Sequence, residues 1–418
     1  MVPSFIAKAQ ANGIALDVLN VDNASLFFLF EKCIINRCPN TKRNWSHSME
    51  KKSIKATKET IRHEIPHPRI RAPRKSKSIH AVRHGSSLAL IKPRENPIIS
   101  PIGENWWEAW QTFNPGAILL DDVVHFLYRA IGSDGISRLG YAASRDGFSI
   151  NERLQRPAYE HGVQDRAFNV FSYFSGGSWG GAEDPRIVRV DDEDTLYMTY
   201  TACNGDLRVG LASIKISDFL KKRWKWRSPR LISPPGEVHK NWLIFPEKIG
   251  GKYAILHSIN PTISIAYVDS LDFQGDEYIS SAHGGEPRKK CWDRWIRGVG
   301  PIPLKTKYGW LVLYHAMDAD WSKYKVGAML LDLNDPTRII ARAKAPILEP
   351  NERYENFGFK GGVVYASGAV IKDDTLLVYY GCADSYVCIA YANCDEFLDA
   401  LIHEKESPLK KAVVRKKR

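Results

Sequence analysis

The sequence lacks any long apolar run and has none of the features of a secreted chain. No hydrophobic stretch in its 418 residues approaches the roughly 20 residues that cross a bilayer. The short apolar stretch around Phe27 follows Asp17 and Asp22, and acidic residues there do not fit a secretory signal. We therefore expect a cytoplasmic protein that has no membrane partner.

Cysteine is also scarce. The seven cysteines are an odd number and include no paired C-x-x-C spacing, which argues against a disulfide framework and a zinc site. The sequence contains no close cluster of His and Asp. We therefore expect a reducing compartment, no metal and no cofactor.

Charge is unevenly distributed. The formal net charge is +12, but the basic excess lies in two segments that have little apolar periodicity. We predict a poorly structured N-terminal extension at 1–90, a folded domain at 91–403 and a basic tail at 404–418. Solvated ends are favoured over a nucleic-acid site, so no nucleic-acid partner is expected. Translation from Met1 or from Met49 stays open.

A loose repeat runs from about residue 95 onward. Each of five units has an alternating strand, a turn rich in Asp or Gly, a second strand rich in Tyr and Leu, and a third strand. The pattern is typical of an all-β protein, and units of this size predict a five-bladed β-propeller. The alternative is a β-sandwich. After the last unit, apolar spacing at Phe397, Leu398 and Leu401 predicts a short C-terminal helix.

In a propeller the first strand of each blade lines a central channel, so one position in each unit should meet at its mouth. The predicted positions are Asn114, Asp184, Lys240 with Asn241, Arg297, and Lys360 or Glu355. Polar residues at five equivalent positions are hard to explain as packing. Carboxylates, guanidinium groups and the plentiful aromatic residues suit a sugar.

The stretch "GGAEDPRIVRV" places two carboxylates at the mouth of one such strand. Asp184 can donate the proton that a departing glycosidic oxygen needs. Adjacent residues of an extended segment point in opposite directions, so Glu183 is not the second catalytic carboxylate. We expect Glu183 to hold Arg186 or another residue of the site.

Several stretches resemble one enzyme family. "GGAEDPRIVRVDDEDTLYMTYTA", "KNWLIFPEKIGGKYAILH", "GVGPIPLKTKYGWLVLYH" and "GAVIKDDTLLVYYGCAD" are similar to the family-130 glycoside phosphorylases and hydrolases, which act on β-mannosides. The resemblance covers roughly residues 92–400. It implies that Asp184 is the general acid, passing its proton through a mannose hydroxyl. It also implies substrate-binding roles for further residues: Asn114, Arg129, Arg138 and Asp384.

The same resemblance leaves two reactions open. The phosphate-binding positions of the phosphorylases correspond to Lys240, Arg297, His315 and Ser258, but the phosphorylases carry Arg where this chain has Ser258. Losing one planar guanidinium favours hydrolysis, for which an inverting enzyme needs a second carboxylate. The candidate bases are Glu237, Glu286 and Asp293.

We therefore expect an inverting glycosidase acting on β-mannosides, with β-1,2-linked manno-oligosaccharides as substrate. The first alternative is a phosphorylase that uses inorganic phosphate and releases mannose 1-phosphate. The second is a non-catalytic propeller that binds glycans. A homo-oligomer stays open.

Overall fold

The computed structural model describes residues 88–163, 170–281, 287–288, 291–318 and 323–404. These residues belong to one compact unit, Gly85–Arg418. The predicted N-terminal extension and C-terminal tail lie outside the described residues, apart from the last three positions of the former and the first of the latter.

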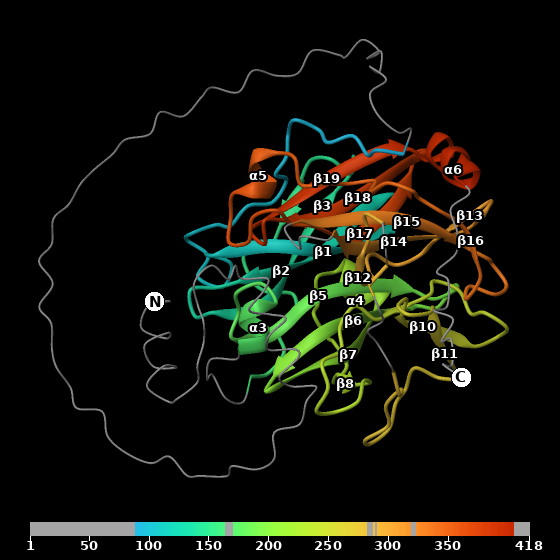
Figure 1. Cartoon of the computed structure of the whole chain (residues 1–418). Helices are drawn as coiled ribbons and strands as arrows, with labels where there is room; N and C mark the ends of the chain where they lie inside the picture. The colour runs from blue at the N-terminus through green and yellow to red at the C-terminus, as the bar shows by residue number, and fades with distance from the viewer. Residues whose placement is uncertain (1–87, 164–169, 282–286, 289–290, 319–322, 405–418) are drawn as a thin grey trace, which may run out of the picture. The chain divides into compact units, whose positions relative to one another are not determined.

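The described chain is mostly β, as predicted, and its strands fall into five antiparallel groups that follow the five sequence units (Figure 1). Group 1 contains β1 (Gln111–Leu120), β2 (Val123–Ile131), β3 (Ile136–Ser144) and β4 (Glu152–Arg153). Group 2 contains β5 (Gly180–Arg189), β6 (Thr195–Asn204), β7 (Asp206–Lys215) and β8 (Arg230–Leu231). Group 3 contains β9 (Leu243–Ile244), β10 (Tyr253–Ser258) and β11 (Ser264–Val268).

Group 4 contains β12 (Trp295–Val299), β13 (Leu304–Thr306), β14 (Gly309–Met317), β15 (Tyr324–Leu331) and β16 (Ile339–Arg342). Group 5 contains β17 (Val364–Lys372), β18 (Thr375–Cys382) and β19 (Tyr386–Asn393). A short parallel pairing of Ile136 with Gly180 and of Ser137 with Gly181 joins groups 1 and 2 into one sheet.

The described ranges contain four helices, which connect or flank these groups: α3 (Val170–Phe174), α4 (Ile216–Leu220), α5 (Arg353–Asn356) and α6 (Cys394–His403). The helix α6 occupies the position where apolar spacing predicted it. The Asn393 side chain caps it by accepting from the Glu396 N–H, and Phe397, Leu398 and Leu401 are buried. None of the helices in the described ranges is long and apolar enough to cross a membrane.

Acidic turns make the tight hairpins. Asp121 and Asp122, between β1 and β2, have φ values of 48° and 61°, and Asp373 and Asp374, between β17 and β18, have 47° and 58°. Two successive residues with positive φ form the turn that matches the twist of paired strands, and Asp tolerates this conformation. The "DD" and "KDD" signals in the sequence therefore mark the turns correctly.

The core consists of five hydrophobic clusters, and each one draws on two groups. Residues of groups 1 and 2, 2 and 3, 3 and 4, and 4 and 5 form four of them. The fifth contains Phe126 of β2 and Tyr379 of β18, so it joins group 5 to group 1. Each group therefore buries one face against the group before it and another against the group after it, as a layered β-fold requires.

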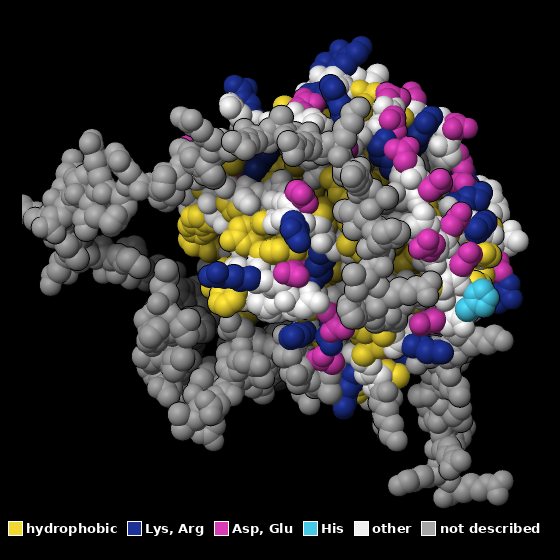
Figure 2. Space-filling model, turned by 90° about the horizontal axis from the view of Figure 1, so that it is seen from above, with side chains coloured by type: hydrophobic (Ala, Val, Ile, Leu, Met, Phe, Trp, Pro, Cys, Tyr) yellow, Lys and Arg dark blue, Asp and Glu magenta, His cyan; other side chains and the backbone are white. Residues whose placement is uncertain are grey.

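The exposed surface is mixed. Seen from above, hydrophobic side chains gather toward the left, whereas acidic and basic side chains are interspersed toward the right (Figure 2). Interspersed charges of both signs are typical of a solvated surface. The apolar part of that face is the exception.

Inner strands approach one another closely where their ladders are interrupted. Strand β1 has a β-bulge between Phe113 and Gly116, and β5 has one between Glu183 and Arg186. A Cβ atom on Gly116 would lie 2.6 Å from the backbone oxygen of Pro185. Only glycine therefore allows the bulge of β1 to pack against the bulge of β5.

Replacement of Gly116 by Ala tests this contact. We expect Gly116→Ala to lower the free energy of unfolding by about 1–3 kcal/mol, the range for overpacking a rigid site. The matched control is Gly103→Ala, because nothing lies within 4 Å of a Cβ there. Urea denaturation of both variants measures the difference, and equal stabilities would contradict the close approach.

Candidate active site

Two β-bulges bring Asn114 and Asp184 together. Each residue precedes a proline, which has no N–H for the ladder and is tolerated at a bulge. Each has a positive φ, 45° for Asn114 and 49° for Asp184, a conformation that Asn and Asp adopt more readily than other residues with a side chain. The Asn114 Nδ2 donates to Asp184 Oδ1 at 2.8 Å. The bulges thus re-aim two side chains of different groups toward one point.

One oxygen of Asp184 stays available. Asp184 is only 4% exposed, and its Oδ1 accepts from both Asn114 and Arg129, the latter at 3.3 Å. No hydrogen bond from the described part of the chain reaches Oδ2. A carboxyl group held through one oxygen can carry a proton on the other, which is the arrangement that a general acid needs.

Arg129, on β2, is fully buried between the two carboxylates. Its Nη2 lies 2.9 Å from Glu183 Oε1, and its Nη1 donates to the Ser175 carbonyl at 2.7 Å. Burial acts to lower the pKa of Arg129, but Glu183 and Asp184 raise it above its usual value. The guanidinium is therefore charged, and it fixes both carboxylates.

Glu183 is a structural acid at this site. Its oxygens accept from the hydroxyls of Ser172, Ser175 and Ser178 at 2.7–3.1 Å, in addition to Arg129. These donors occupy both oxygens of Glu183, which agrees with the prediction that Glu183 is not the second catalytic carboxylate. Its cationic partner, however, is Arg129 and not Arg186.

Arg186 instead holds the backbone of the site. Its Nη1 donates to the Asp184 carbonyl at 2.8 Å, and its Nε donates to the Gly300 carbonyl at 2.8 Å. Its Nη2 reaches Asn241 Oδ1 and the Tyr365 hydroxyl, both at 3.1 Å. One side chain therefore connects groups 2, 4 and 5 and supports the unusual backbone conformation of Asp184.

His315 and Tyr365 are stacked beneath this network. Their ring centroids are 3.9 Å apart. The His315 Nε2 lies 2.7 Å from the Ala366 carbonyl, which can only accept, so Nε2 carries the proton. Burial lowers the pKa of His315 to about 3, and the positive charge of Arg186 adds to the effect. His315 is therefore neutral at ordinary pH, and it supplies no positive charge.

Asp384 is a second buried carboxylate near the acid. It follows β18, has a φ of 46° and is 6% exposed. Burial raises its pKa, and Asp184 raises it further, whereas Lys360, Arg129 and Lys240 oppose the shift. These charged groups act on Asp384 because it lies close to them, and its role in substrate binding stays a prediction. Lys240 itself donates to the Ser175 hydroxyl.

Arg297 and Asn241 complete the cluster. The Asn241 Nδ2 donates to the Arg297 carbonyl at 3.5 Å, and the Arg297 Nε donates to the Tyr324 hydroxyl at 3.0 Å. Lys360 lies 5.9 Å from the centroid of the Tyr324 ring. Of the two candidates for the fifth position, Lys360 is therefore near the site. Glu355 caps α5 and pairs with Lys92.

Four predicted residues remain, and three of them join the cluster through no hydrogen bond or ion pair of the described residues. Arg138 pairs with Asp134 and Glu160 and lies over the Trp106 ring. Glu237 contacts His239 at 2.9 Å, and its side chain is more than half exposed. Asp293 is buried and bound by Arg288, Arg342 and the Tyr314 hydroxyl. The fourth residue, Glu286, lies outside the described residues.

Asp293 is thus an internal counter-ion whose oxygens are both occupied, which is not the arrangement of a base that activates water. Its sequence context, "CWDRW", gave no sign of these partners because Arg342 is 49 residues away.

Sequence reasoning also missed Tyr365 and the three serines. Tyr365 lies on β17, the innermost strand of group 5. It follows the predicted position Lys360 by five residues, and this closeness was the one sign in the sequence that Tyr365 belongs to the site. Ser172, Ser175 and Ser178 lie in or just after α3, and no spacing rule connects them to Glu183.

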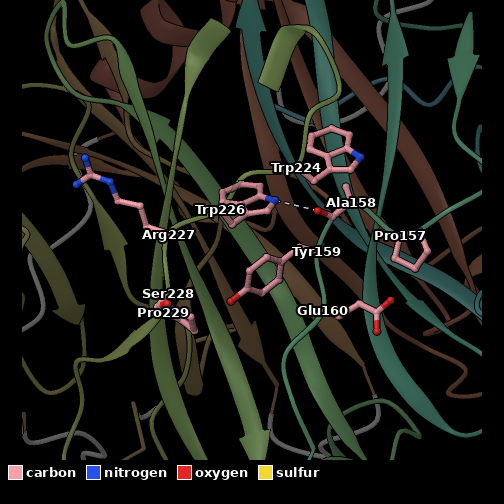
Figure 3. Close-up of a pocket in the computed structure, with 9 residues that line it drawn as sticks. All are labelled: Pro157, Ala158, Tyr159, Glu160, Trp224, Trp226, Arg227, Ser228 and Pro229. Carbon is pink, nitrogen blue, oxygen red and sulfur yellow. Dashed lines mark hydrogen bonds between the residues drawn. The ribbon is translucent and has the colours of Figure 1, made fainter. Parts of the chain in front are cut away.

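A separate cavity of about 350 Å³ lies between residues 157–160 and 224–229 (Figure 3). Its walls include Tyr159, Trp224 and Trp226, and the Trp226 indole N–H donates to the Ala158 carbonyl. It includes none of the residues around Asp184. The cavity is therefore distinct from the Asp184 cluster.

Comparison with known proteins identifies the family. A profile of Glyco_hydro_130, described as beta-1,4-mannooligosaccharide phosphorylase, matches residues 95–403. The chain belongs to glycoside hydrolase family 130. The resemblance seen in the sequence is therefore confirmed, and the protein is an enzyme of the glycoside hydrolase and phosphorylase type.

Relatives within this family include phosphorylases. The 1,2-beta-oligomannan phosphorylase of Thermoanaerobacter sp. is 38% identical over 315 residues, which are 72% of this chain and 97% of that protein. A beta-1,2-mannobiose phosphorylase from the same organism is 34% identical, covering 72% and 96%.

Solved structures agree with the family assignment. The beta-1,2-mannobiose phosphorylase of Listeria innocua, in complex with beta-1,2-mannobiose, has a TM-score of 0.57 and 27% identity, covering 75% of this chain and 99% of that chain. Another structure, described as one of the family's glycoside hydrolases that target beta-1,2 mannosidic linkages in Candida mannan, has a TM-score of 0.59 and 27% identity, covering 73% and 94%.

Substitution of Arg129 tests the buried ion pair. We expect Arg129→Met to lower the free energy of unfolding by about 3–5 kcal/mol, because it leaves Glu183 buried without a cation. The control is Arg189→Met, since Arg189 is partly exposed and its carboxylate partner Asp192 is 4.0 Å away. A loss no larger than that of the control would show that the pair does not hold the site together.

Neutral His315 makes stability depend on pH in a defined direction. The pKa of His315 is 6.5 in the unfolded chain and about 3 in the folded protein. As pH falls below 6.5, His315 therefore binds a proton in the unfolded chain but stays neutral in the folded protein. The contribution of neutral His315 to the free energy of unfolding is therefore complete above pH 6.5 and falls by about 1.4 kcal/mol per pH unit below it. In His315→Phe, which keeps a ring against Tyr365, the slope between pH 6 and pH 4 should be shallower. Equal slopes in urea denaturation would contradict the assignment.

Proposed function

We propose that the protein is an inverting β-mannoside phosphorylase that acts on β-1,2-linked manno-oligosaccharides, with Asp184 as general acid. The observation that carries the proposal is the geometry at Asp184: one oxygen is anchored by Asn114 and Arg129, and the other is open. The names of the relatives support phosphorolysis over the hydrolysis that the sequence favoured.

The contacts of the candidate bases point the same way. Hydrolysis with inversion needs a carboxylate that is free to activate water. Asp293 is occupied by two arginines and a tyrosine, and Glu237 is half exposed beside His239. Phosphate needs no base, because it is itself the nucleophile.

Lys240 and Arg297 supply positive charge for phosphate. Charge-assisted bonds from such groups are the usual means of holding a phosphate dianion. His315 adds no positive charge, because it is neutral and its Nε2–H donates to the Ala366 carbonyl. Ser258 adds only a hydroxyl, which donates to the Asn260 carbonyl at 3.0 Å. The site therefore binds phosphate with fewer cations than the family pattern has.

In the proposed reaction, a phosphate oxygen attacks the anomeric carbon of the terminal mannosyl unit. The bond between that carbon and the glycosidic oxygen breaks, and the oxygen takes the proton of Asp184, relayed through a mannose hydroxyl. The products are mannose 1-phosphate and an oligosaccharide that is one unit shorter. Asn114, Arg129 and Asp384 lie near the mannosyl unit.

We also propose that the five strand groups are the blades of a closed propeller. The five core clusters support this arrangement, because they join each group to the next and join group 5 back to group 1. A ring of this kind places the inner-strand bulges around a shared axis.

The cytoplasm is the proposed location. Within the described chain Cys203, Cys382, Cys388 and Cys394 form no disulfide, which suits a reducing compartment.

Phosphate dependence tests the function directly. Purified enzyme is incubated with β-1,2-mannobiose with and without inorganic phosphate, and products are separated by chromatography. We expect mannose 1-phosphate and mannose in equal amounts, formed only with phosphate. Two mannose molecules per substrate, formed equally without phosphate, would establish the hydrolase alternative.

The control for this assay is Asp184→Asn. The amide is nearly isosteric and cannot donate an acidic proton, so turnover should fall by a factor of about 100 or more while the fold is kept. Retention of most of the activity would remove Asp184 from its role.

A further inference from the structure

Exposed aromatic side chains concentrate just before the inner strands. Of the eight large aromatic side chains that are exposed in the described ranges, six lie in the segments that lead into β1, β5 and β17. They are Trp106, Trp110, Tyr173, Trp179, Phe357 and Phe359. Exposed aromatic rings are costly in water, so a pair of them held close to the Asp184 cluster is a candidate binding surface.

Two of these rings form a pair. Tyr173 and Phe359 have ring centroids 5.8 Å apart and an interplanar angle of 88°. Tyr173 is 37% exposed and Phe359 is 46% exposed. The Phe359 ring lies against the backbone of Gly177, because a Cβ there would be 2.8 Å from it. Packing therefore holds both rings in place while leaving part of each open.

The segments that carry the pair also carry contacts of the active site. Tyr173 is in α3, and two residues later Ser175 donates to Glu183 and accepts from Arg129 through its carbonyl. On the other side, the Phe359 N–H donates to the Ser385 hydroxyl, next to Asp384. Gln111 ties the two segments together by donating to the carbonyls of Gly176 and Asp384.

We propose that Tyr173 and Phe359 form the second acceptor subsite, which binds the mannosyl unit two positions beyond the bond that is broken. The proposal rests on the proposed function. A sugar unit stacks its C–H face on an aromatic ring, and Lys360, the next residue along the chain, offers a donor to its hydroxyls. The terminal mannosyl unit lies at Asp184, and the rest of the oligosaccharide passes over the two rings toward solvent.

This arrangement predicts a dependence on substrate length. Mannobiose places one unit beyond the broken bond, and mannotriose places two. In Phe359→Ala and in Tyr173→Ala, the ratio of kcat/KM for β-1,2-mannotriose to that for β-1,2-mannobiose should fall about fivefold, mainly through KM, which corresponds to the loss of one stacking contact.

The chain offers a matched control. Phe357 is two residues from Phe359 and is 67% exposed, but its ring lies beside Arg353 and not beside Tyr173. Phe357→Ala should leave the ratio unchanged, and Phe359→Trp should restore it because an aromatic face returns. A ratio that is unchanged in both alanine variants, or that falls equally in Phe357→Ala, overturns the proposal.

Two further measurements separate other outcomes. Calorimetric binding of mannotriose to Asp184→Asn, with and without Phe359→Ala, reports the subsite even if phosphate proves not to be the nucleophile. Tyr173→Ala and Phe359→Ala are also compared by sedimentation. If they dissociate an oligomer and leave mannotriose binding intact, the pair is an interface between copies of the chain and the subsite is rejected.

Discussion

Arg129 has no solvent exposure and lies between two carboxylates, Glu183 and Asp184, at the bulge within β5. Glu183 satisfies its charge, and three serine hydroxyls satisfy the remaining lone pairs of Glu183. Because a buried pair is stable only when its hydrogen bonds are complete, Arg129, Glu183 and the segment after α3 must form as a unit. That unit fixes Asp184 through a single oxygen.

The inner strands make this unit possible. Bulges at Asn114 and Asp184 give these residues positive φ values and turn their side chains toward each other. Gly116 permits the strands to approach, and Arg186 binds the Asp184 carbonyl from the other side. Contacts with groups 4 and 5 therefore hold the backbone at the acid in place. The aromatic pair of Tyr173 and Phe359 belongs to the same construction, because its segments carry Ser175 and flank Asp384.

Much of this could be predicted from the sequence. Alternation and acidic turns predicted the strand groups, and the equivalent inner-strand positions of the units predicted that Asn114 and Asp184 meet. The family resemblance then supplied Arg129 and Asp384. The remainder depends on contacts between distant segments: Asp293 is adjacent in sequence to plausible site residues, but it is neutralised by Arg342. Tyr365 contacts Arg186 and Ser175 contacts Glu183 only because the fold brings these segments together. No local sequence pattern identifies such partners.

The choice between hydrolysis and phosphorolysis also depends on contacts between distant segments. Ser258 favoured hydrolysis when only the number of cations was considered, and the occupied state of Asp293 became visible only in the structure. The most direct test is a crystal structure of Asp184→Asn with β-1,2-mannobiose and phosphate. The account predicts a mannosyl unit beside residue 184 and phosphate on Lys240 and Arg297, about 3–3.5 Å from the anomeric carbon. A water held there by a carboxylate, or a sugar bound away from residue 184, would contradict it.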